Sequence, residues 1–404
     1  MNILWLSHLI PYPPKGGVLQ RSYNLMKELS KYHKLYIVCF SQKALHPTDE
    51  KRQQALDGLS KICEIAGVFD IKSDQHQWGQ HILALKSLFT VDPYTVNWIK
   101  NPEVGLRIEK VVKENNIDLV HFDTVSLCTY LNNVSTCKKV LNHHNIESHM
   151  MLRRASQEDT YLKKLYYYQE GLKLRHYERK ICRHFDLNIT CSNADSARLL
   201  DDSPGLFVDD IPNGVDLDYF YPLGSKQKKS SLIFAGGMSW YPNVAAIEFF
   251  TKNVWPGLIK EQPDTQMTVV GRNPPSWLKD FADREDGFTV TGFVDDVRPY
   301  IDSAAVYVCP INDGGGTKLK VLDALAMGKA LVAHPIACEG IEVTDGENVL
   351  FATTPMEYID KIQLLFRDEQ LRNQLGENGR KLIEEKYSFT SIGKKLSELY
   401  SSLV

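Results

Sequence analysis

The sequence predicts two α/β domains in tandem, each a doubly wound parallel sheet covered by helices. Short apolar segments without polar alternation, such as Leu35–Phe40, alternate with longer segments that have the apolar spacing of a helix, such as Leu19–Lys31. Strands that are apolar throughout are typical of parallel sheets buried on both faces, and their alternation with helices indicates βαβ units. The same alternation starts again after residue 230, which predicts a second sheet.

The expected elements follow one another along each half of the chain. In the first half they include Ile3–Ser7, Leu19–Lys31, Leu35–Phe40, Glu103–Glu114, Leu119–Phe122, Lys139–Leu141 and Leu187–Thr190. In the second half we expect strands at Ser231–Ala235, Gln266–Gly271, Phe288–Thr291, Ala305–Cys309 and Ala330–Ala333, and helices from about Asn243 and about Thr317. Turn residues at 212–216 and a polar linker at 221–230 separate the halves. We therefore predict domains at residues 1–218 and 219–387.

Composition excludes several classes of protein. The 404 residues carry a net charge of −3, which argues against a nucleic-acid partner. The eight cysteines form no CxxC pair, so we expect reduced, buried thiols rather than a zinc site. The N-terminus is apolar from its first residues and predicts a strand, not a signal peptide. No apolar run reaches about 18 residues, so no transmembrane helix is expected. With reduced thiols, the chain is expected to be cytoplasmic, either free or peripheral at the inner face of the membrane.

The strongest functional signal is a glycine-rich loop between a strand and a helix. Its residues are Gly314, Gly315, Gly316, Thr317 and Lys318. Glycines let the backbone approach a phosphate closely, and the free N–H groups at a helix N-terminus point at an anion. The pattern therefore predicts a phosphate site.

Two charged residues strengthen this interpretation. Lys318, expected in the first turn of the helix, adds a positive charge for the same phosphates. Asp323 follows Gly316 by seven residues, about two helical turns, and so lies on a similar face. A carboxylate there can accept hydrogen bonds from a ribose diol. The glycines, Lys318 and Asp323 at this spacing therefore indicate a functional site more strongly than the glycines alone.

This loop and helix resemble the donor-diphosphate helix of retaining GT-B glycosyltransferases of glycosyltransferase family 4. The pattern Gly-Gly-Gly-Thr-Lys-Leu-Lys is similar to a subgroup of sugar transferases associated with bacterial exopolysaccharide systems. The resemblance implies two Rossmann-like domains that face an interdomain cleft, with the acceptor on the first and the nucleotide sugar on the second. It also implies that a last helix, about residues 388–404, returns to the first domain. The family's Glu at the ribose is Asp323 here, and its Glu at the donor sugar has no counterpart.

The resemblance implies further donor contacts in the second domain. Gly237 lies in a strand–loop segment where many family members place an Arg and a Lys on the diphosphate. This chain has Met238 and Asn243 at that segment, so Lys318 and Arg272 are expected to carry more of the charge.

Two loops complete the expected donor side. Val294 belongs to the loop where the family holds the base, largely through backbone groups. Glu339 matches a subgroup pattern after a strand and is expected near the sugar.

The first domain supplies fewer matches. Gly16 and Gly17 resemble the family's glycine-rich loop near the donor phosphate, with a plain turn as the alternative. His143 and His144 follow a strand where the family often has a residue facing the donor sugar. Because neighbouring side chains at a strand end point opposite ways, only one of them is expected to reach the cleft, and His144 is favoured. Asp123, at another strand end, is a further candidate.

These features lead to one hypothesis. The chain is expected to move a sugar from a nucleoside-diphosphate sugar, with UDP favoured over GDP, to a hydroxyl of a glycan or lipid-linked acceptor. Glycosyl transfer passes through an oxocarbenium-like transition state, and backbone N–H groups with Lys318 can stabilise the leaving diphosphate. We therefore expect no cofactor and no metal ion. By resemblance the anomeric configuration is retained.

Contact with an anionic membrane is a separate expectation. The long, helix-like segment Met150–Arg183 is rich in Lys and Arg, and Gln77–Lys100 is rich in Trp, Leu and Phe. Either segment can meet a lipid surface or a charged acceptor. A solvated helix face and ordinary core packing are the alternatives.

Other functions stay open at this point. A nucleotide-sugar 2-epimerase shares the GT-B architecture, and the missing Glu allows a non-catalytic sugar- or nucleotide-binding subunit. A dinucleotide oxidoreductase is disfavoured, because no GxGxxG with an acidic residue about 20 positions later follows a strand.

Overall fold

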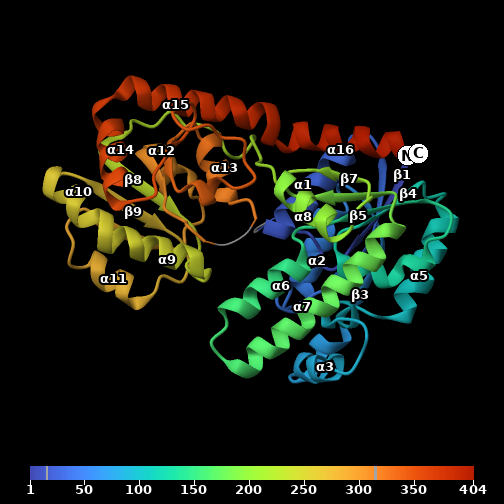
Figure 1. The fold of residues 1–404 in the computed structure, drawn as a ribbon. Coiled ribbons are helices and arrows are strands. Elements are labelled where there is room, and N and C mark those ends of the chain that lie inside the picture. The colour runs from blue at the N-terminus through green and yellow to red at the C-terminus, as the bar shows by residue number, and fades with distance from the viewer. Residues whose placement is uncertain (15–16, 314–315) are drawn as a thin grey trace. The chain divides into compact units, whose positions relative to one another are not determined.

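A computed structural model describes residues 1–14, 17–313 and 316–404. The chain divides into two compact units, one of Met1–Pro212 with Ile392–Val404 and the other of Asn213–Ser391. Each unit contains one parallel sheet with helices packed around it (Figure 1). The predicted fold class of two doubly wound α/β domains is therefore confirmed.

The sheet of the first unit has the strand order β3-β2-β1-β4-β5-β6-β7. The strands are β1 (Asn2–Ser7), β2 (Lys34–Ser41), β3 (Glu64–Asp70), β4 (Leu119–Phe122), β5 (Lys138–Asn142), β6 (Leu187–Thr190) and β7 (Val208–Asp210). β1 pairs in parallel with both β2 and β4, so the strand order reverses at that point. In open α/β sheets such a switch point forms a crevice at the carboxyl ends of the strands, where ligands bind.

Helices flank this sheet. They are α1 (Gly17–Leu29), α2 (Asp49–Leu59), η1 (Lys72–Gln75), α3 (Gly79–Ser87), α4 (Tyr94–Trp98), α5 (Pro102–Glu114), η2 (Val125–Asn133), α6 (Glu147–Gln157), α7 (Tyr161–Ile181), η3 (Cys182–His184), α8 (Asn193–Asp202) and most of α16 (Phe389–Leu403). Local signals set their ends: α5 begins where the Asn101 side chain accepts a hydrogen bond from the Glu103 N–H, with Pro102 as the first residue. No helix in the described ranges is long and apolar enough to span a membrane.

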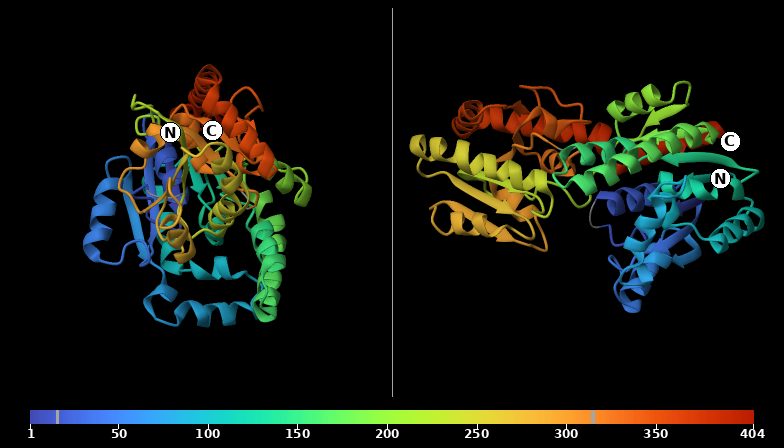
Figure 2. Two further views of the ribbon diagram at one scale, coloured as in Figure 1. Left: turned by 90° about the vertical axis from the view of Figure 1, so that its left-hand side faces the viewer. Right: turned by 60° about the horizontal axis from the view of Figure 1, so that its bottom comes forward.

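The basic segment after residue 147 is a hairpin rather than one continuous helix. α6 ends at Gln157 and α7 begins at Tyr161, and the two helices pack side by side (Figures 1 and 2). Their antiparallel register follows from the contact of Leu152 with Gly171, whose missing side chain leaves room for the leucine. Tertiary packing thus decides the break, because no proline or glycine marks it in the sequence.

The sheet of the second unit has the order β10-β9-β8-β11-β12-β13. The strands are β8 (Lys228–Ala235), β9 (Gln266–Val270), β10 (Phe288–Gly292), β11 (Ala304–Cys309), β12 (Ala330–Ala333) and β13 (Leu350–Phe351). The helices are α9 (Tyr241–Phe249), η4 (Phe250–Val254), α10 (Trp255–Glu261), α11 (Ser276–Ala282), α12 (Arg298–Ser303), α13 (Leu319–Ala326), η5 (Pro335–Cys338), α14 (Pro355–Arg367), α15 (Glu369–Leu382) and η6 (Ile383–Tyr387). β8 begins inside the expected linker, and the order reverses between β8 and β11.

The last helix completes the core of the first unit. Leu396 and Tyr400 of α16 are fully buried, and the Tyr400 hydroxyl contacts Nδ1 of His121 in β4. Gly393 lies so close to α1 that a Cβ added there would be 2.2 Å from Cβ of Glu28. The chain end is therefore held by close helix packing.

We expect Gly393→Ala to destabilise the first unit. In a solvent-exposed helix, Gly→Ala stabilises the helix by about 1 kcal/mol. Here, overpacking against Glu28 lowers the free energy of unfolding by about 1–3 kcal/mol. The melting temperature, followed by near-UV circular dichroism, should fall. Lys394→Ala on the exposed face of α16 is the matched control and should leave it unchanged. An unchanged or higher melting temperature for Gly393→Ala would contradict this close packing.

Candidate functional site

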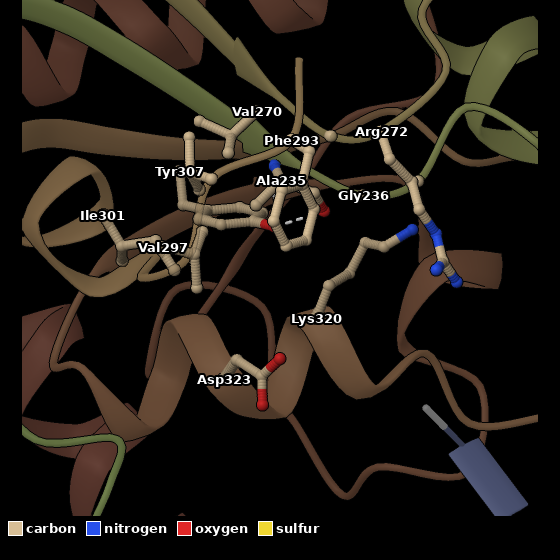
Figure 3. Close-up of a pocket in the computed structure, with 13 residues that line it drawn as sticks. Ala235, Gly236, Val270, Arg272, Phe293, Val297, Ile301, Tyr307, Lys320 and Asp323 are labelled. Carbon is tan, nitrogen blue, oxygen red and sulfur yellow. Dashed lines mark hydrogen bonds between the residues drawn. The ribbon is translucent and has the colours of Figure 1, made fainter. Parts of the chain in front are cut away.

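A cavity of about 270 Å³ opens at the carboxyl ends of the strands in the second unit (Figure 3). It lies at the ends of β8, β9 and β10, with α13 on one side. The lining residues are Ala235, Gly236, Gly237, Val270, Gly271, Arg272, Phe293, Val294, Val297, Ile301, Tyr307, Lys320 and Asp323. This is the position at which a doubly wound sheet binds ligands.

Close backbone packing forms one wall of the cavity. The Gly236 N–H donates to the Val270 carbonyl at 2.8 Å, and the Met238 N–H donates to the Arg272 carbonyl at 2.9 Å. A Cβ at Gly271 would lie only 1.9 Å from the Gly236 carbonyl oxygen, so only glycine fits there. The ends of β8 and β9 therefore run past each other without intervening side chains.

Tyr307 fixes the end of β8 from the neighbouring strand. Its hydroxyl accepts from the Ala235 N–H at 3.1 Å and donates to the Ala235 carbonyl at 3.1 Å. Burial holds the pKa of this phenol well above its usual value, so it stays neutral. The strand end is thus tied down next to the cavity.

Two charged side chains enter the cavity from α13 (Figure 3). Residues three positions apart on a helix share a face, which is why both Lys320 and Asp323 line the cavity. Burial lowers the pKa of Lys320 to about 8 and raises the pKa of Asp323 to about 8. Asp323 is half-buried and lines the cavity. That group is therefore available to a ligand.

The structure brings together part of the donor site that the sequence predicts. Gly237, Arg272, Val294 and Asp323 all line the cavity. Lys320 was missed, although it belongs to the same Gly-Gly-Gly-Thr-Lys-Leu-Lys pattern, because the interpretation gave the phosphate charge to the first lysine alone.

Lys318 lies differently from the expectation. It precedes α13 as the N-cap residue, rather than lying in the first turn, and does not line the cavity. Its side chain is 4% exposed and its ammonium donates to the Gly316 carbonyl at 2.8 Å. The backbone of the loop thus occupies one of its donors.

The glycine-rich loop is described only in part. Gly16, Gly314 and Gly315 lie outside the described residues. Gly316 has a φ of +73°, a conformation that glycine adopts without strain. The neighbouring Thr317 has a buried hydroxyl oxygen without a hydrogen-bond partner among the described residues. An unpaired buried hydroxyl is costly, which makes it a candidate ligand contact.

Two other predicted residues are not among those that line the cavity. Glu339 follows β12 and ends η5, where its N–H donates to the Ile336 carbonyl at 3.3 Å. Gly17 is the first residue of α1 in the first unit and is exposed. Neither of them lines the cavity.

The first unit has its own polar centre at the switch point of its sheet. Asp123, directly after β4, is fully buried, and one carboxylate oxygen accepts from the Ser22 hydroxyl at 2.7 Å. The other oxygen accepts from the Asn142 amide at 3.1 Å and lies 3.2 Å from Nε2 of His144. Nearby His144 and His121 hold the pKa of Asp123 well below its usual value, against the effect of burial. The carboxylate is therefore charged.

The two neighbouring histidines face opposite ways. His144 lies beside Asp123, whereas His143 is 2% exposed and has its Nε2 3.3 Å from the Asn188 side-chain oxygen. Burial lowers the pKa of His143 to about 4, so this imidazole is neutral within the core. His144 is thus the imidazole at the strand ends.

A third imidazole near this centre was not predicted. His8 follows β1, and burial lowers its pKa to about 4, with the charge of Asp123 opposing that shift. The only sequence signal for His8 is its place after the first strand. In the described part of the chain, no group of three or more His, Cys, Asp or Glu side chains is arranged to hold a metal ion.

Comparison with known proteins identifies the family. The model described as Glycosyltransferase Family 4 matches residues 15–219, and the model described as Glycosyl transferases group 1 matches residues 229–368. A relative from Klebsiella pneumoniae, an uncharacterised 44.6 kDa protein of the cps region, is 22% identical over 303 residues. That alignment covers 72% of this chain and 76% of the relative.

Solved structures share the architecture over the whole chain. Sucrose-phosphate synthase from Thermosynechococcus elongatus has a TM-score of 0.70 at 16% identity and covers 100% of this chain and 99% of its own. HepE from Anabaena in complex with UDP has a TM-score of 0.66 at 14% identity and covers 100% of both chains. At such identities the likeness is one of fold. The chain therefore belongs to glycosyltransferase family 4 and has the GT-B fold.

Proposed function

We propose that this protein transfers a sugar from a nucleoside-diphosphate sugar, with uridine as the favoured base, to a hydroxyl of a glycan or lipid-linked acceptor. The observation that carries the proposal is the cavity of the second unit, where Gly237, Arg272, Val294 and Asp323 converge. That half of the chain, residues 219–387, is the donor domain in this proposal, and residues 1–218 with the last helix form the acceptor domain. The complex of HepE with UDP supports a uridine nucleotide as the ligand.

The cavity offers different residues to the base, the ribose and the diphosphate of the proposed donor. The base lies against the backbone at Val294, and the ribose hydroxyls meet Asp323. With a pKa raised to about 8, the Asp323 carboxyl is largely protonated at neutral pH and can both donate and accept hydrogen bonds. The diphosphate lies toward Arg272 and the glycine-rich loop. Thr317, with its buried hydroxyl, supports a ligand at that loop.

The proposed transfer uses no metal ion and retains the anomeric configuration. Charge grows on the leaving diphosphate in the transition state, and preorganised N–H groups with nearby cations stabilise such charge in a dry site. Arg272 and the loop that contains Lys318 provide these groups. The acceptor oxygen bonds to the anomeric carbon on the face from which the diphosphate leaves, within an ion pair. The bond from that carbon to the diphosphate breaks and the departing diphosphate takes the hydroxyl proton, so no protein nucleophile is needed.

UDP should stabilise the protein without magnesium. Ligand at about 100 times its dissociation constant adds about 2.7 kcal/mol to the free energy of unfolding. We expect a rise in melting temperature with UDP in EDTA, a smaller one with GDP, and none with NAD. Asp323→Ala removes a hydrogen bond to the ribose and should weaken UDP binding about tenfold. The exposed Asp360→Ala is the matched control.

The other outcomes separate the rival functions. No shift with any nucleoside diphosphate would overturn the donor site. UDP binding without transfer from UDP-sugars to any glycan acceptor would favour a non-catalytic subunit. Turnover of a UDP-sugar to its 2-epimer, detected by NMR, would favour an epimerase, whereas an inverted product linkage would contradict retention.

His144 should act in turnover rather than in nucleotide binding. Asp123 orients its ring at the strand ends of the first unit, as expected for an imidazole that meets substrate. We expect His144→Ala to lower kcat for transfer by about a hundredfold and to leave the dissociation constant of UDP unchanged. His184→Ala, an exposed histidine on η3, is the control. An unchanged kcat in His144→Ala would remove this assignment.

We also propose peripheral contact with an anionic membrane. Apolar side chains are exposed just before α3, on α3, on the loop after it and on the first half of α7; these are Trp78, Ile82, Leu85, Phe89, Val91, Tyr161, Leu162 and Leu165. Lys173 of α7 donates to the Leu88 carbonyl at 3.2 Å, so the loop is tied to that helix. The exposed Lys163 and Lys164 add positive charge beside these residues. Apolar and basic groups together match an anionic lipid surface.

Vesicle binding tests this contact. Phe89→Ser combined with Val91→Ser removes two side chains that are 88% and 86% exposed. We expect binding to phosphatidylglycerol-containing vesicles to weaken about tenfold or more, and wild-type binding to fall with added salt. Leu106→Ser, which changes a residue 66% exposed on α5, is the control. Equal binding by the double variant and the wild type, or no binding by either, would refute the proposal.

A further inference from the structure

Lys320 occupies an unusual position in the cavity. It is the second residue of α13, and a Cβ added at Gly236 would lie 2.9 Å from its Nζ. The ammonium therefore rests against bare backbone at the end of β8. A side chain at Gly236 would push it away, so the glycine keeps room for the cation.

Neutral groups hold this ammonium. Nζ donates to the side-chain oxygen of Asn243, and it lies 5.1 Å from the ring centroids of both Phe234 and Trp240. Ring faces attract cations without neutralising them. Within the described ranges, no carboxylate lies at ion-pair distance from Nζ; Asp323, one turn along α13, is the nearby acid. The structure thus orients a lysine that has no counter-ion of its own.

Asn243 connects the lysine to the strand–loop segment. Its amide nitrogen donates to the Gly237 carbonyl at 2.7 Å, while its oxygen accepts from Lys320. The family resemblance predicts an Arg and a Lys in this segment, where this chain has Met238 and Asn243. The Asn243 amide instead positions the ammonium of Lys320, which comes from α13.

A second cation lies at the next residue of the same loop. A Cβ at Gly237 would be 3.7 Å from Cγ and 3.8 Å from Nε of Arg272. In Figure 3 the side chain of Lys320 extends toward Arg272, and both line the cavity. Two cations beside two adjacent glycines suit a ligand with two linked phosphates.

We propose that Lys320, positioned by Asn243, binds the diphosphate of the donor together with Arg272. This inference rests on the proposed nucleoside-diphosphate donor and names the cation that recognises it. The negative charge of the bound diphosphate then pairs with the Lys320 ammonium, which has no carboxylate partner among the described residues. Lys318, whose ammonium donates to the Gly316 carbonyl, acts on the shape of the loop instead.

The assignment predicts a pH dependence. Burial and the charge of Lys318 lower the pKa of Lys320 to about 8, while Asp323 opposes the shift. A diphosphate favours the protonated amine, so UDP binding should weaken as pH rises above about 8, at most tenfold per pH unit. Burial raises the pKa of the facing Cys309 thiol, which stays neutral. Arg272 and Lys318 are the other facing cations.

Asp323 titrates in the same range and has to be separated from Lys320. Its pKa is raised to about 8, and its negative charge also repels UDP at high pH. In Asp323→Asn we expect the decline of UDP affinity above pH 8 to persist. In Lys320→Arg, whose guanidinium remains protonated, the part of the decline that Lys320 causes should vanish.

Calorimetric titration of the full chain with UDP and with uridine tests the inference. Lys320→Met should weaken UDP binding at neutral pH by about ten- to a hundredfold, the range for a hydrogen bond to a charged group, and leave uridine binding unchanged. Asn243→Leu should weaken UDP binding less. Lys320→Arg should restore most of the affinity, and the exposed Lys279→Met should match the wild type.

The outcomes distinguish two failures. If the wild type binds no nucleoside diphosphate, the proposed function fails first. If the wild type binds UDP but Lys320→Met binds it equally well, the role of Lys320 is overturned and the proposed function stands. Equal loss of UDP and uridine binding in Lys320→Met, without rescue by Lys320→Arg, would show a structural effect and overturn it as well.

Discussion

The second unit depends on one backbone contact, the approach of Gly271 to the Gly236 carbonyl. Two strand ends can pass this closely only where neither carries a side chain, because the oxygen would occupy the place of a Cβ. The contact leaves backbone without side chains at the carboxyl ends of β8 and β9, and the cavity opens there. Lys320 and Arg272 approach that backbone for the same reason. A side chain at either glycine would displace the strand end or the cations beside it.

The two units handle buried charge in opposite ways. In the first, Asp123 is surrounded by donors that depress its pKa, so it adds stability above its usual pKa that is lost as pH falls. In the second, the pKa of Asp323 is raised to about 8, which removes stability as pH rises from about 4 to about 8. The pKa of Lys320 is lowered to about 8, so burial of the charged ammonium also reduces the free energy of unfolding at neutral pH. Donors within the protein thus stabilise the charge of Asp123, whereas Lys320 and Asp323 bear the cost of burial beside the cavity.

Local pattern was enough to predict most strands and the reversal into a second sheet. Apolar runs such as the one at β11 have no other stable environment than a sheet covered on both faces. The edge strand β3 was missed, because Glu64 and Gly67 interrupt its apolar character and only pairing with β2 makes it a strand. The break between α6 and α7 was missed for a related reason, since it depends on packing of Leu152 against Gly171.

The amino-acid pattern was enough to predict the fold class, the family resemblance and candidate site residues such as Asp323 on a helix and Arg272 after a strand. These follow from periodicity and glycine spacing, which are local properties of the chain. The fold was needed to show that Lys320, rather than Lys318, lines the cavity, and that the favoured His144 lies beside Asp123 while His143 lies in the core. Neighbouring residues of the same type are equivalent in a pattern. The fold distinguishes them, because it directs one side chain toward backbone or core and the other toward the carboxyl ends of the strands.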